Sequence, residues 1–304
     1  MFSKILVPLD CSDLAEQVLP LVSTLASGLN TPIQLISVIQ QLPDEFSGST
    51  GVDQREVMED WRRQASEYLQ DVSRRLEQDD LKVSYAVVQG DIASSIVGEA
   101  EQHDDAVIAM STHGWEGTAR WNLGSVAHKI LQAAANPVLV VRGQGQRPKE
   151  CKRKLDNIIV PLDGSDLSEL ALPYALSLAK AHSAQLVLMR VTASVWDYYS
   201  HMDHTVLHSG DLSKVARDRA AEYLDRVGEQ LQRQGISQME QRIETGEPAG
   251  TIIDLAESIP NSLITMVTHG LGSSGRRRWA MGSVAQRVAG SCASPVLVVP
   301  PQGH

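Results

Sequence analysis

The chain has 304 residues, of which 42% are hydrophobic and 21% are charged, and it carries a formal net charge of −10. This composition excludes a disordered chain, and the negative charge argues against nucleic acid as a partner, because such binding depends on clustered lysine and arginine. No apolar run reaches the about 18 residues that a membrane span needs, and the N-terminal residues enter a strand-like pattern at once, so we expect no signal peptide, no membrane partner and a cytoplasmic location.

The first half of the chain alternates short β-branched runs with helical patterns. Ser12 and Asp13 provide a helix cap after the first run, and a long amphipathic pattern extends from Glu56 to Gln78. The runs are almost continuously apolar, which is typical of parallel strands that are covered on both faces. The strands predicted in this half are residues 5–9, 32–39, 82–88, 106–110 and 137–141.

The second half repeats the first in the same order. The segment KILVPLDCSDLAEQVLPLVSTLA, which starts at Lys4, matches NIIVPLDGSDLSELALPYALSLA, which starts at Asn157. Ser165 and Asp166 provide the matching helix cap, and a second long amphipathic pattern extends from Ser213 to Gln234. The strands predicted in this half are residues 158–162, 184–191, 239–243, 263–267 and 295–299.

The repeat predicts two homologous domains that are joined by a linker. The segment from Gly143 to Lys154 is polar and basic without apolar periodicity, so we place the domains at residues 1–146 and 147–304. Repeated βαβ units predict an α/β fold in each domain, with a doubly wound parallel sheet of five strands flanked by helices. The apolar final strands suit sheet edges that pair, so we expect the tandem domains to pack as an intrachain pseudo-dimer.

The loops beyond the carboxyl ends of the strands are the places where such sheets bind ligands. After the fourth strand, Ser111-Thr112-His113-Gly114 turns the chain, nine residues follow, and Gly124-Ser125 opens a helix. The unpaired backbone N–H groups and the dipole at a helix start favour a phosphate. Thr-His-Gly and Gly-Ser-Val-Ala recur in the second half, which favours a ligand site over an ordinary turn.

These motifs carry a resemblance to a known family. The spacing G-x2-G-x9-G-[ST], joined to a first strand that ends in Val-Pro-x-Asp-x-Ser, resembles the universal stress protein family, over almost the whole chain and as two tandem domains. The resemblance implies five parallel strands in each domain, dimerisation through the last strand and, in one large branch of the family, an ATP site built from these motifs. It therefore implies a stress-response protein that binds ATP, or AMP or ADP, with Mg²⁺ as a candidate companion ion.

The resemblance also assigns residues of this chain to the nucleotide. It implies that Asp10 contacts the ribose or a metal-bound water, that Val38 meets the adenine, and that the residues from Met110 onward surround the ribose and phosphates. The implied set in the first domain is Pro8, Leu9, Asp10, Ser12, Val38, Met110, Ser111, His113, Gly114, Gly124, Ser125 and Val126. The implied set in the second domain is Pro161, Leu162, Asp163, Ser165, Val191, Met266, Val267, His269, Gly270, Gly282, Ser283 and Val284.

The chain departs from the family pattern in both copies of this motif. Ser111 stands where the first motif glycine is usual, but the spacing of nine residues before Gly124 is kept, so we expect the first site to bind. In the second domain Val267 takes that position, and eleven residues separate the two loop glycines. A β-branched residue resists positive φ and crowds a phosphate, which leaves the second site in question. Residues 276–278, all arginine, either restore phosphate affinity there or form a solvated turn.

The function expected from these patterns is regulatory binding with little or no hydrolysis. Bound nucleotide would order the loop from Ser111 to Leu123 and change the surface offered to an unidentified protein partner. A slow ATPase or adenylating enzyme, a scaffold that binds no nucleotide, and a homodimer of the chain are alternatives that the sequence leaves open. His201, His204 and His208 have helical spacing and either hold a transition metal or belong to a polar crossover segment.

Overall fold

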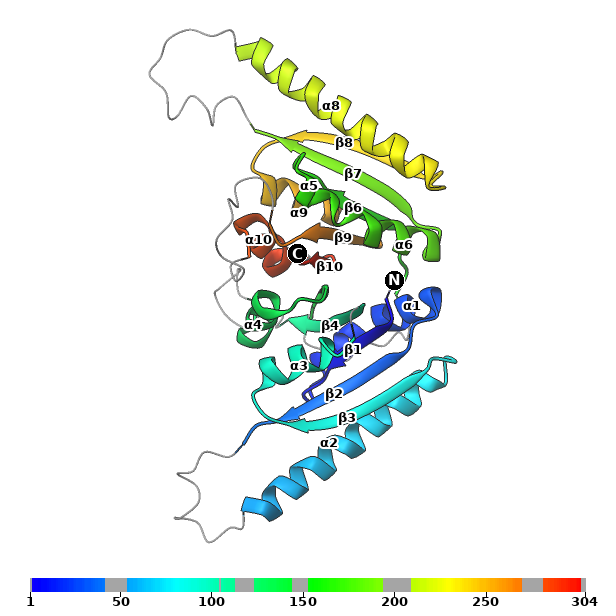
Figure 1. Cartoon of the computed structure of the whole chain (residues 1–304), viewed down its shortest axis with the longest axis vertical. Helices are drawn as coiled ribbons and strands as arrows, with labels where there is room; N and C mark the ends of the chain where they lie inside the picture. The colour runs from blue at the N-terminus through cyan, green and yellow to red at the C-terminus, as the bar shows by residue number, and fades with distance from the viewer. Residues whose placement is uncertain are drawn as a thin grey trace, which may run out of the picture. The chain divides into compact units, whose positions relative to one another are not determined.

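The computed structural model describes residues 2–41, 54–103, 105–112, 123–143, 153–193, 209–269 and 281–301. The chain divides into two compact units, Met1–Lys154 and Leu155–His304, and each is an α/β domain with a parallel sheet (Figure 1). Within the described ranges, none of the helices combines the length and apolar character needed to cross a membrane.

The sheet of the first unit has the strand order β3-β2-β1-β4-β5. The paired strands are parallel, and Pro8 at the end of β1 lies opposite Ile36 of β2. The winding direction reverses between β1 and β4, because β2 follows β1 on one side and β4 lies on the other. The elements are β1 (Lys4–Pro8), η1 (Ala15–Val18), α1 (Leu19–Leu29), β2 (Ile33–Ile39), α2 (Gln54–Glu77), β3 (Val83–Gln89), α3 (Ile92–Ala100), β4 (Ala106–Thr112), α4 (Ser125–Ala133) and β5 (Val138–Arg142).

The second unit repeats this arrangement with the strand order β10-β9-β6-β7-β8. Its paired strands are also parallel, and Pro161 at the end of β6 lies opposite Met189 of β7. The elements are β6 (Asn157–Pro161), α5 (Asp166–Glu169), α6 (Leu172–His182), β7 (Gln185–Thr192), α8 (Ser209–Arg233), β8 (Met239–Thr245), α9 (Pro248–Ser258), β9 (Ser262–Val267), α10 (Ser283–Ser291) and β10 (Val296–Val299).

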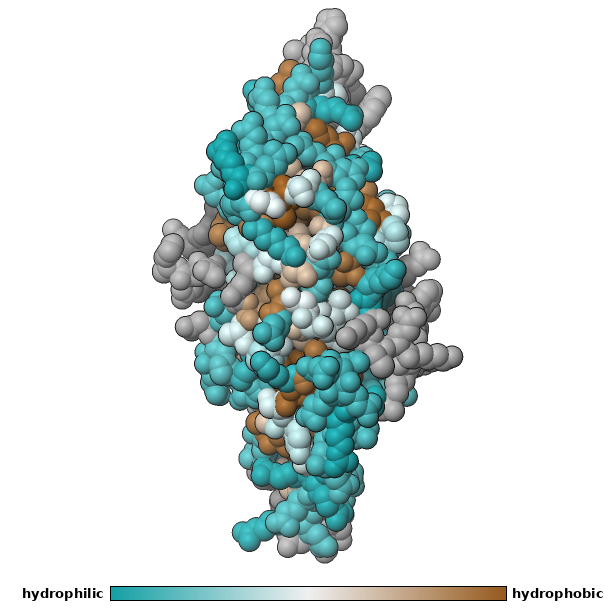
Figure 2. Space-filling model, turned by 90° about the vertical axis from the view of Figure 1, so that its right-hand side faces the viewer, coloured by the Kyte–Doolittle hydropathy of each residue, from teal (hydrophilic) through white to brown (hydrophobic). Residues whose placement is uncertain are grey.

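The predicted α/β fold with flanked parallel sheets is confirmed, and the central strands are apolar for the expected reason. The middle residues of β1, Ile5, Leu6 and Val7, are buried, as strands covered on both faces must be. The expectation that all strands are covered on both faces is wrong for β3 and β8, which end the strand order of their units and keep several half-exposed side chains. The face drawn in Figure 2 is mostly hydrophilic, with hydrophobic residues in small groups.

One helix cap was predicted after the first strand of each domain, and the helices that follow them differ. Ser165 caps α5, because its side chain accepts a hydrogen bond from the backbone N–H of Ser168. Ser12 accepts one from the backbone N–H of Ala15 at 3.1 Å, but the turn that follows is the short 3₁₀ helix η1 and not an α-helix.

Candidate functional site

The described residues of the first unit enclose a cavity of about 150 Å³ at the point where the winding direction reverses. Parallel sheets of this kind bind ligands at that point, beyond the carboxyl ends of the strands. The lining residues come from the ends of β1, β2 and β4, from the start of η1, and from the first turns of α3 and α4. They are Pro8, Leu9, Asp10, Ser12, Leu14, Ala15, Ile36, Val38, Ile92, Ile96, Met110, Ser111, Gly124, Ser125, Val126 and Ala127.

The lining is apolar on the β2 side of β1, whereas on the other side hydroxyl groups lie among apolar residues such as Met110 and Val126. Ile36 and Val38 come from β2, and the α3 side chains that line the cavity with them are also isoleucines. The hydroxyl group of Ser111 belongs to β4, which lies across β1 from β2 in the strand order, and the hydroxyl group of Ser125 belongs to the first turn of α4. A ligand with an apolar ring at one end and an anionic group at the other matches this division.

The turn after β1 holds the Asp10 carboxylate in place. Its Oδ1 accepts hydrogen bonds from the backbone N–H of Ser12 at 3.1 Å and from the Ser12 hydroxyl at 2.5 Å. Cys11 between them has a left-handed backbone with φ of 66°. Among the described residues, Oδ2 of the exposed Asp10 has no hydrogen-bond partner, so it is available to a ligand hydroxyl.

The polar side of the cavity is built from the end of β4 and the start of α4. The Ser111 hydroxyl donates to the backbone carbonyl of Ala15 at 3.2 Å, which ties β4 to η1. Gly124 is the N-cap of α4 and makes no side-chain cap, so the first backbone N–H groups of the helix face outward without a partner inside the helix. Ser125, the first residue of α4, is exposed beside them.

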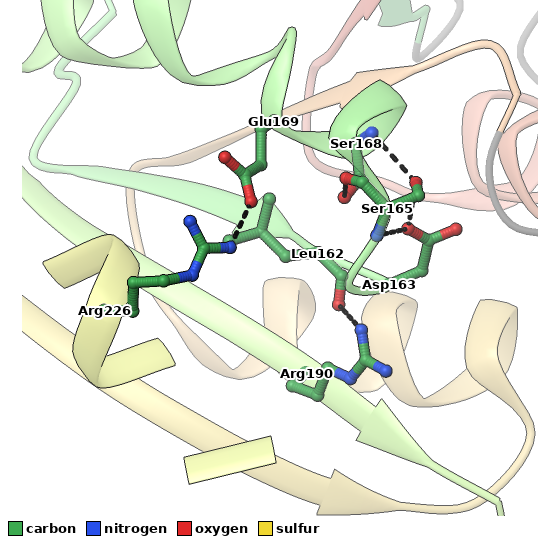
Figure 3. Close-up of polar contacts among 7 residues, drawn as sticks. All are labelled: Leu162, Asp163, Ser165, Ser168, Glu169, Arg190 and Arg226. Carbon is green, nitrogen blue, oxygen red and sulfur yellow. Dashed lines mark hydrogen bonds and ion pairs between the residues drawn. The ribbon is translucent and has the colours of Figure 1, made fainter. Parts of the chain in front are cut away.

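The turn after β6 in the second unit has the same geometry (Figure 3). Oδ1 of Asp163 accepts from the backbone N–H of Ser165 at 3.0 Å and from the Ser165 hydroxyl at 2.6 Å. Gly164 has φ of 84°, in the same left-handed region of backbone conformation as Cys11. Arg190 donates to the carbonyl of Leu162 at 3.4 Å, and a Cβ built on Gly164 would lie 2.4 Å from its Nη1. The backbone angle favours glycine at 164, and a side chain there would also require the Arg190 guanidinium to move.

The end of β9 and the start of α10 differ from their counterparts in the first unit. Val267 is buried in the last position of β9, and the backbone N–H of the N-cap Gly282 donates to the carbonyl of Thr268 at 2.8 Å. His269 follows, and Thr268 Oγ1 lies 2.9 Å from its Nδ1. Partial burial lowers the pKa of His269, which favours the neutral imidazole.

The structure corrects one argument about Val267. Ser111 and Val267 both lie in strands, and neither is among the described residues with positive φ. Resistance of a β-branched residue to positive φ therefore does not distinguish the two domains. The difference is chemical, because Val267 lacks the hydroxyl with which Ser111 reaches the turn after β1.

The structure brings together ten of the twelve residues that the resemblance assigned in the first domain, and the other two, His113 and Gly114, lie outside the described residues. In the second domain Pro161 and Leu162 end β6, Val191 and Met266 lie near the ends of β7 and β9, and Ser283 and Val284 begin α10. The predictions for Gly270, for residues 276–278 and for the three histidines at 201, 204 and 208 fall outside the described residues.

Sequence reasoning missed the part of the lining that α3 and η1 supply. Ile92 and Ile96 stand one helical turn apart at the start of α3, after the N-cap Asp91. Their spacing was a visible signal of a buried helix face. Nothing local, however, indicated that this face would meet β2, which precedes it by more than fifty residues.

Comparison with known proteins gives concordant results for both halves of the chain. Residues 1–142 and 154–300 match the model of the Universal stress protein family. A universal stress protein from Mycolicibacterium smegmatis is 25% identical over 302 residues, which cover 98% of this chain and 97% of that protein. One from Methanocaldococcus jannaschii is 32% identical over 143 residues, or 47% of this chain and 80% of that protein. The crystal structure of a universal stress protein from Archaeoglobus fulgidus shares the fold, with a TM-score of 0.69 at 22% identity over 99% of both chains.

Proposed function

This chain belongs to the universal stress protein family, and on that premise we propose that its first domain binds an adenine nucleotide. The observation that carries the proposal is the cavity at the reversal between β1 and β4, with an apolar wall on one side and hydroxyls and a helix start on the other. Concave sites that combine an apolar lining with a few convergent polar groups are the usual form of small-molecule sites.

The size of the cavity indicates which part of the nucleotide it encloses. Its volume of about 150 Å³ is below the roughly 300 to 1,000 Å³ of complete ligand sites, so it suits the nucleoside alone. The base then packs against Ile36 and Val38, and the free Oδ2 of Asp10 accepts a ribose hydroxyl. The phosphates lie outside, at the first turn of α4, where backbone N–H groups and the helix dipole favour an anion.

The same lining favours binding over turnover. Among the described lining residues, Asp10 is the one ionisable side chain, and no lysine or arginine accompanies it. Phosphoryl transfer depends on cationic groups that neutralise the charge developing on the phosphoryl oxygens. We therefore expect nucleotide to be held with little or no hydrolysis, as a regulatory ligand. In the second domain the valine at 267 removes one polar contact, so we expect weaker binding there.

The test counts nucleotides on matched variants of the full chain. Native mass spectrometry and calorimetry with ATP, with and without Mg²⁺, are applied to the wild type, Gly124→Val and Gly282→Val. A valine at either N-cap places a stiff β-branched side chain beside the first backbone N–H groups of the helix, and at 282 its Cβ would lie 3.0 Å from the carbonyl oxygen of Thr268. We expect one nucleotide per chain that is lost in Gly124→Val and retained in Gly282→Val, with thermal melts to confirm that both variants fold.

Each outcome of this experiment bears on a separate part of the proposal. Unchanged affinity in Gly124→Val would refute the site, and no binding by the wild type would refute the function. Two nucleotides per chain would overturn the expectation of a weaker second site. Phosphate release above that of Gly124→Val would show turnover.

A further inference from the structure

A buried carboxylate lies directly behind the cavity wall. Glu16 belongs to η1 and is 1% exposed. Its Oε2 accepts a hydrogen bond from Arg75 Nη2 at 2.9 Å, and its Oε1 accepts one from the Tyr68 hydroxyl at 3.1 Å. Both partners belong to α2. A carboxylate so far from water is tolerated only when it is paired and hydrogen-bonded, so these contacts fix η1 against α2.

Ala15, which precedes Glu16, makes its contacts on the cavity side of η1. Ala15 lines the cavity, its carbonyl accepts the Ser111 hydroxyl at 3.2 Å, and its N–H donates to the Ser12 hydroxyl at 3.1 Å. Ser12 in turn holds Asp10. The start of η1 is therefore held on its cavity side by the hydroxyl groups of Ser12 and Ser111, and on its other side by α2.

Tyr68 remains a hydrogen-bond donor to Glu16 over the whole physiological range. Burial raises the pKa of the Tyr68 phenol, and the adjacent Glu16 carboxylate raises it further. The phenol consequently stays protonated, and its contact with Glu16 does not change with pH in that range.

The second domain has a looser version of this contact. Glu169 is the counterpart of Glu16, and its Oε1 accepts from Arg226 Nη2 at 2.7 Å (Figure 3). The Glu169 side chain is 22% exposed, so water reaches it. Arg226 is itself half exposed and lies over the Tyr223 ring. Loss of this arginine would leave a carboxylate that water can solvate, unlike Glu16.

We propose that Glu16 is a positioning residue for the nucleotide site: its contacts with Tyr68 and Arg75 hold the Ala15 wall in place, and they link ligand binding to α2. This inference rests on the proposed function for its consequence in binding. Removing Arg75 alone leaves a buried charge without its cation, and η1 must move to hydrate it. When the Glu16 charge and Arg75 are removed together, no buried charge needs hydration, so Ala15 keeps its position in the cavity wall.

The test compares Arg75→Met with the double variant Glu16→Gln plus Arg75→Met in the full chain. Affinity for ATP at the first site is measured by calorimetry as the binding that Gly124→Val abolishes. We expect Arg75→Met to weaken it about tenfold, the size of one lost hydrogen bond to a charged group, and the double variant to recover most of the loss. Hydrogen exchange of the backbone amides of residues 12–18 is followed in the same proteins, and we expect faster exchange in Arg75→Met alone.

Two controls separate positioning from stability. Leu81→Ala removes a buried side chain between α2 and β3, so it destabilises the domain without touching Glu16. Arg226→Met removes the arginine that pairs with Glu169 in the second domain. Neither is expected to change affinity at the first site.

The inference and the proposed function can fail separately. Unchanged affinity and exchange in Arg75→Met would overturn the inference, as would an equal loss of affinity in Leu81→Ala or no recovery in the double variant. If the wild type bound no ATP, the proposed function would fail. The exchange of residues 12–18 would then decide by itself whether Glu16 holds the wall.

Discussion

Burial decides how His182 titrates. His182 ends α6, where the helix dipole favours a protonated imidazole, yet burial lowers its pKa. Its buried Nε2 has no hydrogen-bond partner among the residues that the structure describes, so the added proton would be poorly solvated. Because the folded-state pKa is depressed, the unfolded chain binds the proton first as pH falls below about 6.5. Stability that is present above that pH is therefore lost as the solution is acidified.

This titration predicts a measurable pH dependence of stability. We expect the free energy of unfolding in urea to fall between about pH 7.5 and about pH 5.5, and His182→Gln to make the fall shallower. The variant retains part of the slope, because burial also lowers the pKa of His269. A slope equal to that of the wild type would contradict this account.

At the scale of elements, sequence reasoning succeeded where local pattern decides structure. Apolar runs located the strands, and Asp10, Val38 and Ser111, which the resemblance assigned to one site, line one cavity at the ends of β1, β2 and β4. It failed where tertiary contact decides. The exposure of β3 depends on its place at the end of the strand order, and the role of Glu16 depends on a helix more than fifty residues away. Neither of these two features produces a periodic pattern in the sequence.

Glu247 connects two helices of the second domain. Its carboxylate accepts from the backbone N–H groups of Ala249 and Gly250 at the start of α9, and from Arg287 Nη1 of α10 at 2.6 Å. We expect Glu247→Ala to lower the free energy of unfolding by about 1 kcal/mol, the usual size of a lost N-cap. The matched control is Glu229→Ala, which breaks only the exposed pair with Arg233 within α8 and should cost less than about 0.5 kcal/mol. Equal losses in the two variants would contradict the capping role.

At the scale of the whole molecule, pairing of the two domains through their final strands stays a prediction. β5 is the last strand in the order of the first unit, and its sequence is VLVVR. An apolar edge without a partner tends to pair with another copy. We expect the fragment of residues 1–146 to form homodimers in sedimentation experiments at concentrations where the full chain does not self-associate. A monomeric fragment would contradict the predicted pairing.

The turn that follows the first strand of each domain is stabilised by hydrogen bonds between its own residues. Asp10 with Ser12, and Asp163 with Ser165, form hydrogen bonds through Oδ1 within the turn itself, without any ligand. A loop of this kind keeps its shape when it is empty, so the fold does not depend on what the loop holds. The contacts that either copy of the repeated domain makes with a ligand can therefore change without loss of the turn that follows its first strand.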